Sequence, residues 1–136
     1  PTTPATTEPA KLSPEETVRA WVEARNITVR SGDSEAVYAL STADCTTCRD
    51  SVKPVVQVYR RGGHYETKGW IVDDARRRPD FNKSGEVAVA VEYAAGRTFH
   101  EANADPVSYA SEHHVLMFRL VQQADGWKVR HVLLVS

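Results

Sequence analysis

The sequence predicts an α+β domain in which three helices precede an antiparallel sheet of four or more strands. Apolar residues recur at helical spacing from residue 13 to residue 61, and from residue 64 onward they alternate with polar residues as in strands. The length of 136 residues suits one hydrophobic core, so a single domain over residues 13–136 is expected.

Residues 13–32 carry the signals of a helix at both ends. Ser13 suits the N-cap position, and Glu16 can complete a capping box with it. Pro14 suits the first helical position, and Gly32 can end the helix. The residues that recur at helical spacing on one face are Val18, Trp21, Val22, Arg25 and Val29. This pattern predicts an amphipathic helix.

Two further helices are expected before residue 64. A short one covers residues 35–40, and a longer one begins near Asp44 or Cys45 and stops at Gly62. Pro54 lies inside the longer helix and lacks the N–H that an interior position needs. A kink or a late start is therefore predicted there.

Five strands are expected in the second half of the chain. They cover residues 70–77, 86–93, 97–101, 113–123 and 127–135. Asp125-Gly126 indicates a two-residue hairpin turn, which pairs His131 with Leu120. Because Leu120 has apolar neighbours on its face, His131 is predicted to lie on the concave side that the helices cover. The opposite face is also partly apolar, so a second subunit could cover it in a homodimer.

Cys45 and Cys48 form the motif C-T-T-C, for which several interpretations compete. A zinc site needs two more ligands, and the sequence offers no second cysteine pair. A thioredoxin-type redox site usually follows a strand, whereas this pair lies between two helical segments. At i, i+3 spacing the two Cα atoms are about 5 to 6 Å apart, within disulfide range. A structural disulfide is favoured, with free thiols second, and an oxidising compartment follows from the disulfide.

Residues 1–12 are predicted to form a flexible tether. The segment PTTPATTEPA consists of Pro, Thr and Ala with one Glu, a composition that behaves as an extended spacer. Such a spacer commonly follows a signal peptide or a lipid anchor, and the alternative is an inter-domain linker. We therefore expect an extracytoplasmic protein, secreted or held at the cell envelope.

The charge and hydropathy patterns exclude some classes of binding partner. The formal net charge is −1, with basic and acidic residues interspersed, so no nucleic-acid partner is expected. No apolar stretch approaches the roughly 20 residues that span a bilayer. Contact with a membrane is expected only through a lipid anchor upstream of residue 1.

The order of elements resembles a known architecture. Helices followed by a curved antiparallel sheet with a D-G-W hairpin resemble the cone fold of nuclear transport factor two, ketosteroid isomerase and polyketide cyclases, which is also called cystatin-like. The strings Asp44-Cys45-x-x-Cys48 and Gly69-Trp70, with Gly32-Asp33, Leu40-Ser41 and Gly62-Gly63, resemble an uncharacterised family of actinobacterial lipoproteins. In that family a Thr/Pro-rich spacer follows a lipid-modified cysteine, so the resemblance implies lipid anchoring. It implies no activity.

Six residues are candidates for lining a ligand pocket in such a cone. They are His131, Tyr59, Trp21, Phe118, Tyr93 and Trp70. Ordinary core packing is the competing interpretation of the aromatic residues, and a hydrogen-bonded core histidine is that of His131. The five histidines show no zinc spacing, so neither a metal nor a cofactor is expected.

Carboxylates on strands raise a catalytic alternative. The resemblance to isomerases implies a carboxylate base in an apolar cavity, and Asp73, Asp74 and Glu92 lie on predicted strands. Strand alternation sends Asp73 and Asp74 to opposite faces, so at most one of them points inward. The spacing of these acids along the sequence does not place them in one site, and no catalytic residue is assigned.

The sequence thus favours an extracytoplasmic accessory or binding domain. Its partner is expected to be a small apolar ligand or an envelope protein, engaged through the cone cavity or the sheet face. The alternatives are a small enzyme of the isomerase or cyclase type and an interaction module that dimerises through the sheet.

Overall fold

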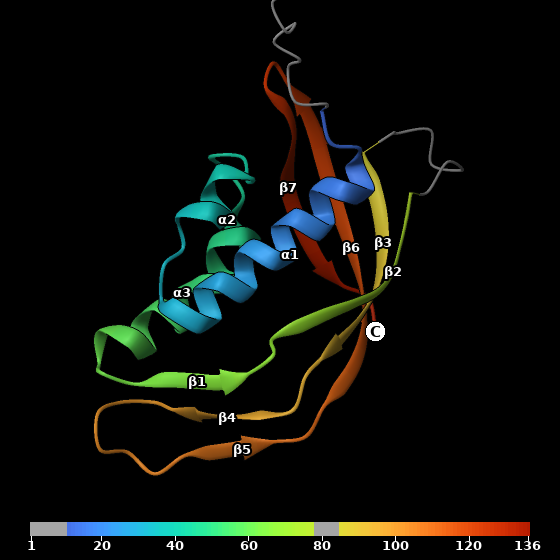
Figure 1. Cartoon of the computed structure of the whole chain (residues 1–136). Helices are drawn as coiled ribbons and strands as arrows, with labels where there is room; N and C mark the ends of the chain where they lie inside the picture. Colours follow the sequence, from blue (N-terminus) through green and yellow to red (C-terminus); the bar gives the residue numbers. More distant parts are fainter. Residues whose placement is uncertain (1–10, 78–84) are drawn as a thin grey trace, which may run out of the picture.

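The computed structural model describes residues 11–77 and 85–136 (Figure 1). The predicted tether over residues 1–12 lies outside the described residues except for Lys11 and Leu12. Three helices precede every described strand, in agreement with the predicted α+β class. The helices are α1 (Pro14–Ser31), α2 (Glu35–Ala39) and α3 (Thr46–Arg60).

The strands of the described residues form two antiparallel sheets. A three-stranded sheet has the order β1-β4-β5, and a four-stranded sheet has the order β2-β3-β6-β7. The strands are β1 (His64–Thr67), β2 (Trp70–Arg77), β3 (Glu86–Tyr93), β4 (Gly96–Phe99), β5 (Val107–Tyr109), β6 (Glu112–Gln123) and β7 (Gly126–Leu134). β1 and β5 were not predicted, and the other five were.

The two sheets lie next to each other, and the helices lie against both of them. The chain passes between the sheets from β1 to β2, from β3 to β4 and from β5 to β6, each time over two residues. Figure 1 shows α1 crossing one face of the four-stranded sheet, with α2 and α3 on the same side. The three-stranded sheet lies beneath α1 and α3 in this view, so the helices have strands on two sides.

Both predicted ends of α1 are confirmed. The Ser13 Oγ accepts a hydrogen bond from the Glu16 N–H at 3.1 Å, and the Ser13 N–H donates to Glu16 Oε1 at 2.9 Å. This reciprocal pair is a capping box. Gly32 ends the helix with a φ of 80°, a left-handed conformation that glycine adopts without a Cβ clash.

Helix α3 continues through Pro54, and the predicted late start is wrong. The helix spans Thr46–Arg60 with Cys45 as its N-cap. Pro54 lies on the solvent side of the helix. Water can therefore satisfy the Asp50 carbonyl that the missing Pro54 N–H leaves without its helical partner.

The core forms between α1 and the four-stranded sheet. Trp21 of α1 and Phe118 of β6 are both completely buried. Their rings meet edge to face, with centroids 5.4 Å apart and an interplanar angle of 74°. The Trp21 Nε1–H donates to Ser41 Oγ at 3.0 Å, so its polar atom is satisfied. These two side chains fill the core beneath α1.

The register of the hairpin between β6 and β7 differs from the prediction. Gln123 pairs with Gly126, so the turn is Ala124-Asp125, and Gly126 contributes its φ of 124° as the first residue of β7. A register shift next to Leu120 then pairs Arg119 with His131. Directly paired residues share a face, so His131 lies on the exposed face of Arg119. The prediction that His131 pairs with Leu120 on the core face is therefore wrong, and its Nδ1 lies 3.4 Å from Thr47 Oγ1 at the start of α3.

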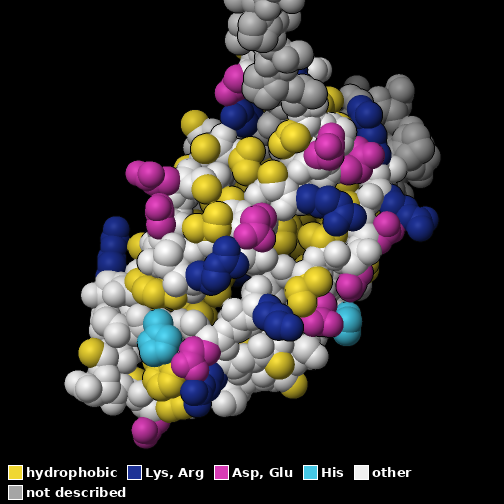
Figure 2. All heavy atoms as spheres, in the orientation of Figure 1, with side chains coloured by type: hydrophobic (Ala, Val, Ile, Leu, Met, Phe, Trp, Pro, Cys, Tyr) yellow, Lys and Arg dark blue, Asp and Glu magenta, His cyan; other side chains and the backbone are white. Residues whose placement is uncertain are grey.

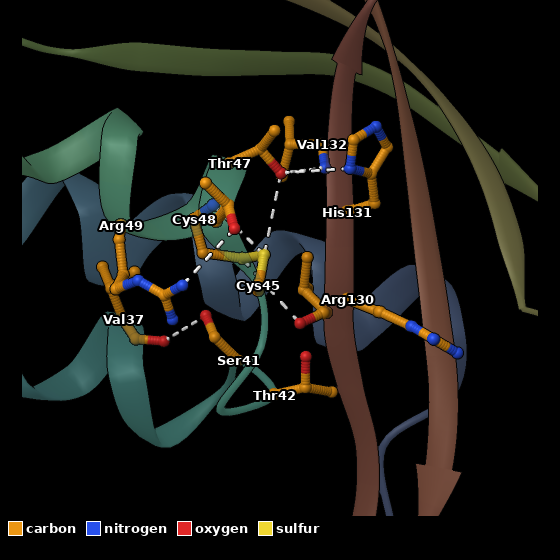
Figure 3. Close-up of a disulfide and its surroundings, with 12 residues drawn as sticks. Val37, Ser41, Thr42, Cys45, Thr47, Cys48, Arg49, Arg130, His131 and Val132 are labelled. Carbon is orange, nitrogen blue, oxygen red and sulfur yellow. Dashed lines mark hydrogen bonds between the residues drawn. A yellow bond between two sulfur atoms is a disulfide. The ribbon is translucent and has the colours of Figure 1, made fainter.

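A disulfide closes the first turn of α3, next to the edge strand β7 (Figure 3). The Cys45 and Cys48 Cα atoms are 5.3 Å apart, as the spacing predicted. Between them, the Thr47 Oγ1 accepts a hydrogen bond from the Val132 N–H at 2.8 Å. Ahead of the disulfide, the Thr42 N–H donates to the Val129 carbonyl at 2.9 Å. These bonds cover part of the β7 edge and place α3 beside the sheet.

Candidate functional site

A cavity of about 670 Å³ opens between the helices and the two sheets, and we call it the central cavity. Helices α1 and α3 form one wall, with Val29 and Val55 among the apolar residues. Leu116 of β6 and Val132 of β7 line the side of the four-stranded sheet. Tyr65 of β1 lines the side of the three-stranded sheet. The walls are therefore largely aliphatic and aromatic.

Trp70 and Tyr93 form an aromatic wall of the central cavity. They are direct cross-strand partners at the ends of β2 and β3. Their rings stack with centroids 4.7 Å apart and an interplanar angle of 5°. The His114 ring lies next to Tyr93, at a centroid distance of 4.5 Å. Cross-strand pairing thus arranges a flat hydrophobic surface where the two sheets adjoin.

Asn26 of α1 fixes the position of Trp70. Its Nδ2 donates to the Trp70 carbonyl at 2.9 Å, and its Oδ1 accepts from the Trp70 N–H at 2.9 Å. Gly69 permits this approach, because a Cβ at that position would lie 2.3 Å from Asn26 Oδ1. Gly69 also has a φ of 83°. The Gly69-Trp70 pair in the sequence therefore marks the place where α1 docks on β2.

Arg25, one position before Asn26, brings a positive charge into the cavity wall. Its Nε–H donates to Ser51 Oγ at 2.7 Å, and its Nη2 donates to the Ser51 carbonyl at 3.4 Å. Its guanidinium carbon lies 3.9 Å from the centroid of the Trp70 ring. Burial lowers the pKa of Arg25 to about 10, and the side chain stays protonated at neutral pH.

Two tyrosines of the cavity lie close enough to Arg25 for the charges of the three side chains to influence one another's pKa values. Burial raises the pKa values of Tyr65 and Tyr93, and the charge of Arg25 acts in the opposite direction on both. Both hydroxyls are therefore neutral near pH 7 and can donate or accept hydrogen bonds. Tyr59 lies outside the lining, with its hydroxyl donating to the Val29 carbonyl.

The carboxylates of the cavity lie at its exposed margin. Asp50 and Glu112 line it, and both are solvent-exposed. Glu112 accepts a hydrogen bond from His114 at 2.8 Å. The hydrogen bonds of His114 to Glu112 and to the Ser136 carbonyl raise its pKa. The cavity thus has an interior cation and acids near solvent.

The strand carboxylates considered from sequence do not line the central cavity. A register shift between Val72 and Asp74 replaces simple strand alternation. Asp73 and Asp74 are consequently both exposed, and the expectation that they point to opposite faces is wrong. Glu92 lies 3.8 Å from His113 across the strands.

The structure distributes the six predicted pocket residues over four places. Trp70 and Tyr93 line the central cavity. Trp21 and Phe118 are core residues, and Tyr59 packs near Tyr65 with ring centroids 6.2 Å apart. His131 lines a separate hollow on the outer face, which also contains the charged side chains of Asp44, Glu86, Arg119 and Arg130.

The sequence did not predict Arg25 or Tyr109 as cavity residues, and it offered Tyr65 only as a possible hydrogen-bond donor without assigning it to the pocket. Only Arg25 had a signal, because it interrupts the apolar stripe of α1 at helical spacing. Tyr65 and Tyr109 come from the unpredicted strands β1 and β5, which bring them to the cavity from distant parts of the chain.

The outer surface carries charges of both signs. Figure 2 shows Lys and Arg side chains interspersed with Asp and Glu and with hydrophobic side chains on the face that it presents. Charged side chains of the described residues also form ion pairs, as Arg97 does with Glu66 at 2.7 Å and Arg119 with Glu86 at 3.4 Å. This face therefore has no broad field of one sign.

Comparison with known proteins gives a fold neighbour and a family. The crystal structure of the intermembrane space region of the chloroplast protein ARC6 is similar, with a TM-score of 0.59 and 11% sequence identity. The match covers 90% of this chain and 93% of that chain, and at this identity it concerns the fold alone. No curated protein sequence matches the chain. The model of DUF6318, a family of unknown function, matches residues 3–131, and the chain therefore belongs to this family.

Proposed function

We propose that this chain is an extracytoplasmic binding domain that holds a small, largely apolar ligand in its central cavity. The observation that carries the proposal is the cavity of about 670 Å³ between the helices and the two sheets. This volume lies within the range of about 300 to 1,000 Å³ typical of small-molecule sites. Apolar walls with a few polar groups are likewise typical of such sites.

The walls are held from several directions, which favours a preformed site. Asn26 ties α1 to β2 through two hydrogen bonds, and the hydrogen bond from the Val132 N–H to Thr47 Oγ1 holds α3 beside β7. A preformed cavity binds at a lower cost in conformational entropy than one that must order on binding. This arrangement supports ligand binding as the role of the fold.

The location is part of the same proposal. A disulfide persists in oxidising compartments, and a Thr/Pro-rich segment precedes the domain. No helix among the described residues is long and apolar enough to cross a membrane. We propose that the chain is the binding domain of a cell-envelope lipoprotein of actinobacterial type. We further propose that its two adjoining sheets form a cone of the nuclear transport factor two type.

An isomerase or cyclase remains the catalytic alternative. Such an enzyme needs a carboxylate base within reach of a ligand in the cavity. Asp50 and Glu112 are the lining carboxylates, and both are exposed. Tyr65 and Tyr93 could donate hydrogen bonds to an enolate. The exposure of the acids favours binding over catalysis.

An interaction module is the other alternative, and the outer sheet face favours it. Val115 is 37% exposed and Leu133 is 46% exposed on β6 and β7. A homodimer would cover this face and leave the central cavity open. Sedimentation equilibrium separates the two roles, because a stable dimer is expected only for the interaction module.

A blocking substitution tests ligand binding directly. Ala110 lines the central cavity, and the exposed Ala95 does not. We expect the fluorescence of the neutral dye Nile red to rise on binding to the wild-type protein and to Ala95→Trp. Ala110→Trp should reduce this binding at least about tenfold, because the indole occupies the cavity. Equal binding by both variants, or none by the wild type, contradicts the proposal.

A further inference from the structure

We propose that the ligand of the central cavity is an amphiphile with a single carboxylate group, and that Arg25 binds this carboxylate. The inference rests on the proposed function, because it specifies the ligand of the same cavity. Four observations support the inference. Arg25 has no carboxylate partner among the described residues, and it has N–H donors to spare. The cavity walls are apolar, and the acidic residues of the cavity lie at its exposed margin.

Arg25 has no carboxylate partner within ion-pair distance among the described residues, although it lies in the wall of a cavity. Several other arginines of the described residues have one, as Arg30 has Glu23 at 3.1 Å and Arg119 has Glu86 at 3.4 Å. Those pairs lie on the surface, where water already solvates the charges. A half-buried cation gains more from an anion than an exposed one does.

The contacts of Arg25 leave one end of its guanidinium available. Ser51 takes the Nε–H and one N–H of Nη2, and Trp70 covers one face of the group. Nη1 has no hydrogen-bond partner in the described part of the chain, and it is not among the fully buried atoms without a partner. Nη1 and the second N–H of Nη2 form the end of the fork, which matches the two oxygens of a carboxylate.

The remainder of the cavity suits an apolar ligand body. Val29, Val55, Leu116 and Val132 line it together with the stacked Trp70 and Tyr93. Asp50 and Glu112 at the exposed margin would repel a second negative charge. The combination of one interior cation, apolar walls and marginal acids therefore favours a monocarboxylate over a dicarboxylate or a cation.

Decanoate and decan-1-ol are suitable probes, because they share a chain and differ in charge. Both are titrated into the wild-type protein by isothermal titration calorimetry at pH 8, below the concentration at which decanoate aggregates. We expect decanoate to bind at least about tenfold more tightly than decan-1-ol, because charge-assisted hydrogen bonds are stronger than neutral ones. Arg25→Gln should lose the preference for decanoate and bind both probes with equal affinity.

Arg30→Gln is the matched control, since Arg30 lies on the same helix at the surface. It should keep the wild-type preference for decanoate. The wild-type comparison needs no variant, so it tests the inference even if Arg25→Gln fails to fold. Equal affinities of the wild type for both probes, or an unchanged preference in folded Arg25→Gln, overturn the assignment of Arg25. These outcomes leave the proposed function standing, whereas binding of neither probe overturns both.

Discussion

The guanidinium carbon of Arg25 lies 3.9 Å from the centroid of the Trp70 ring, and Trp70 in turn stacks on Tyr93. This contact joins helix α1 to β2 and β3 at the wall of the central cavity. A cation placed over an indole ring is stabilised by the negative face of the ring. The same tryptophan thus supports the fold and the proposed ligand site.

Replacing Trp70 should therefore lower stability substantially. We expect Trp70→Ala to reduce the free energy of unfolding by about 2 to 3 kcal/mol, because a half-buried indole loses its contacts with Arg25 and Tyr93. Trp70→Phe keeps a ring in the stack and should cost about 1 kcal/mol. Urea denaturation measures both values, and an equal loss for the two variants would contradict the importance of the stack.

The two hydrogen bonds between Asn26 and Trp70 give a second prediction. We expect Asn26→Ala to lower the free energy of unfolding by about 2 to 3 kcal/mol, since it leaves a backbone donor and a backbone acceptor without partners. Urea denaturation of this variant provides the measurement. A loss below about 0.5 kcal/mol would show that water replaces Asn26 without cost, and that α1 docks on β2 by apolar contacts alone.

The disulfide should contribute modestly to stability. Cys45 and Cys48 are both completely buried, but they close a very short loop. Replacing both with serine should therefore cost roughly 2 kcal/mol, by the constraint on the unfolded chain. Thiol labelling of the denatured, unreduced protein checks the bond itself. Two reactive thiols would contradict it, and labelling only after reduction would agree with it.

His114 gives a pH-dependent prediction with a definite sign. Its hydrogen bonds to Glu112 and to the Ser136 carbonyl raise its pKa in the folded protein above the ordinary value of 6.5. Protonation of His114 thus favours the folded state. The contribution is complete below about pH 6.5 and is lost as the pH rises through the folded pKa.

An NMR titration of the histidine ring protons tests this statement. The His114 pKa should lie above 6.5 in the wild type and should fall in Glu112→Gln, where the amide carries no charge. Ser108→Ala on β5 is a suitable control, because Ser108 is exposed and pairs with Arg97 of β4 and not with Glu112 or His114. A wild-type pKa at or below 6.5, or one that Glu112→Gln leaves in place, would contradict the account.

Local signals in the sequence predicted the elements that depend on local physics. The capping box of Ser13 and Glu16 and the stop at Gly32 are both present, because each uses atoms a few residues apart. The alternation in residues 86–93 predicted β3 at its observed bounds, since the strand is buried on one face. The disulfide between Cys45 and Cys48 was also predicted from local spacing, because it joins two residues only three positions apart.

Features that depend on tertiary context were not predicted. The bulge beside Leu120 moves His131 to the outer face, and no residue type in β6 or β7 indicates that a bulge occurs there. β1 and β5 have four and three residues, too few for alternation to be informative. Arg25, Tyr65 and Tyr109 meet at one cavity only because the sheets adjoin, so spacing along the chain could not assemble the site.

The most direct test of the central claim is a map of the binding site in solution. Backbone amide shifts of the ¹⁵N-labelled protein are recorded by NMR while decan-1-ol is added. We expect the largest changes on cavity residues such as Val29, Val55 and Tyr65. The absence of changes, or changes concentrated at Val115 and Leu133 on the outer sheet face, would contradict it.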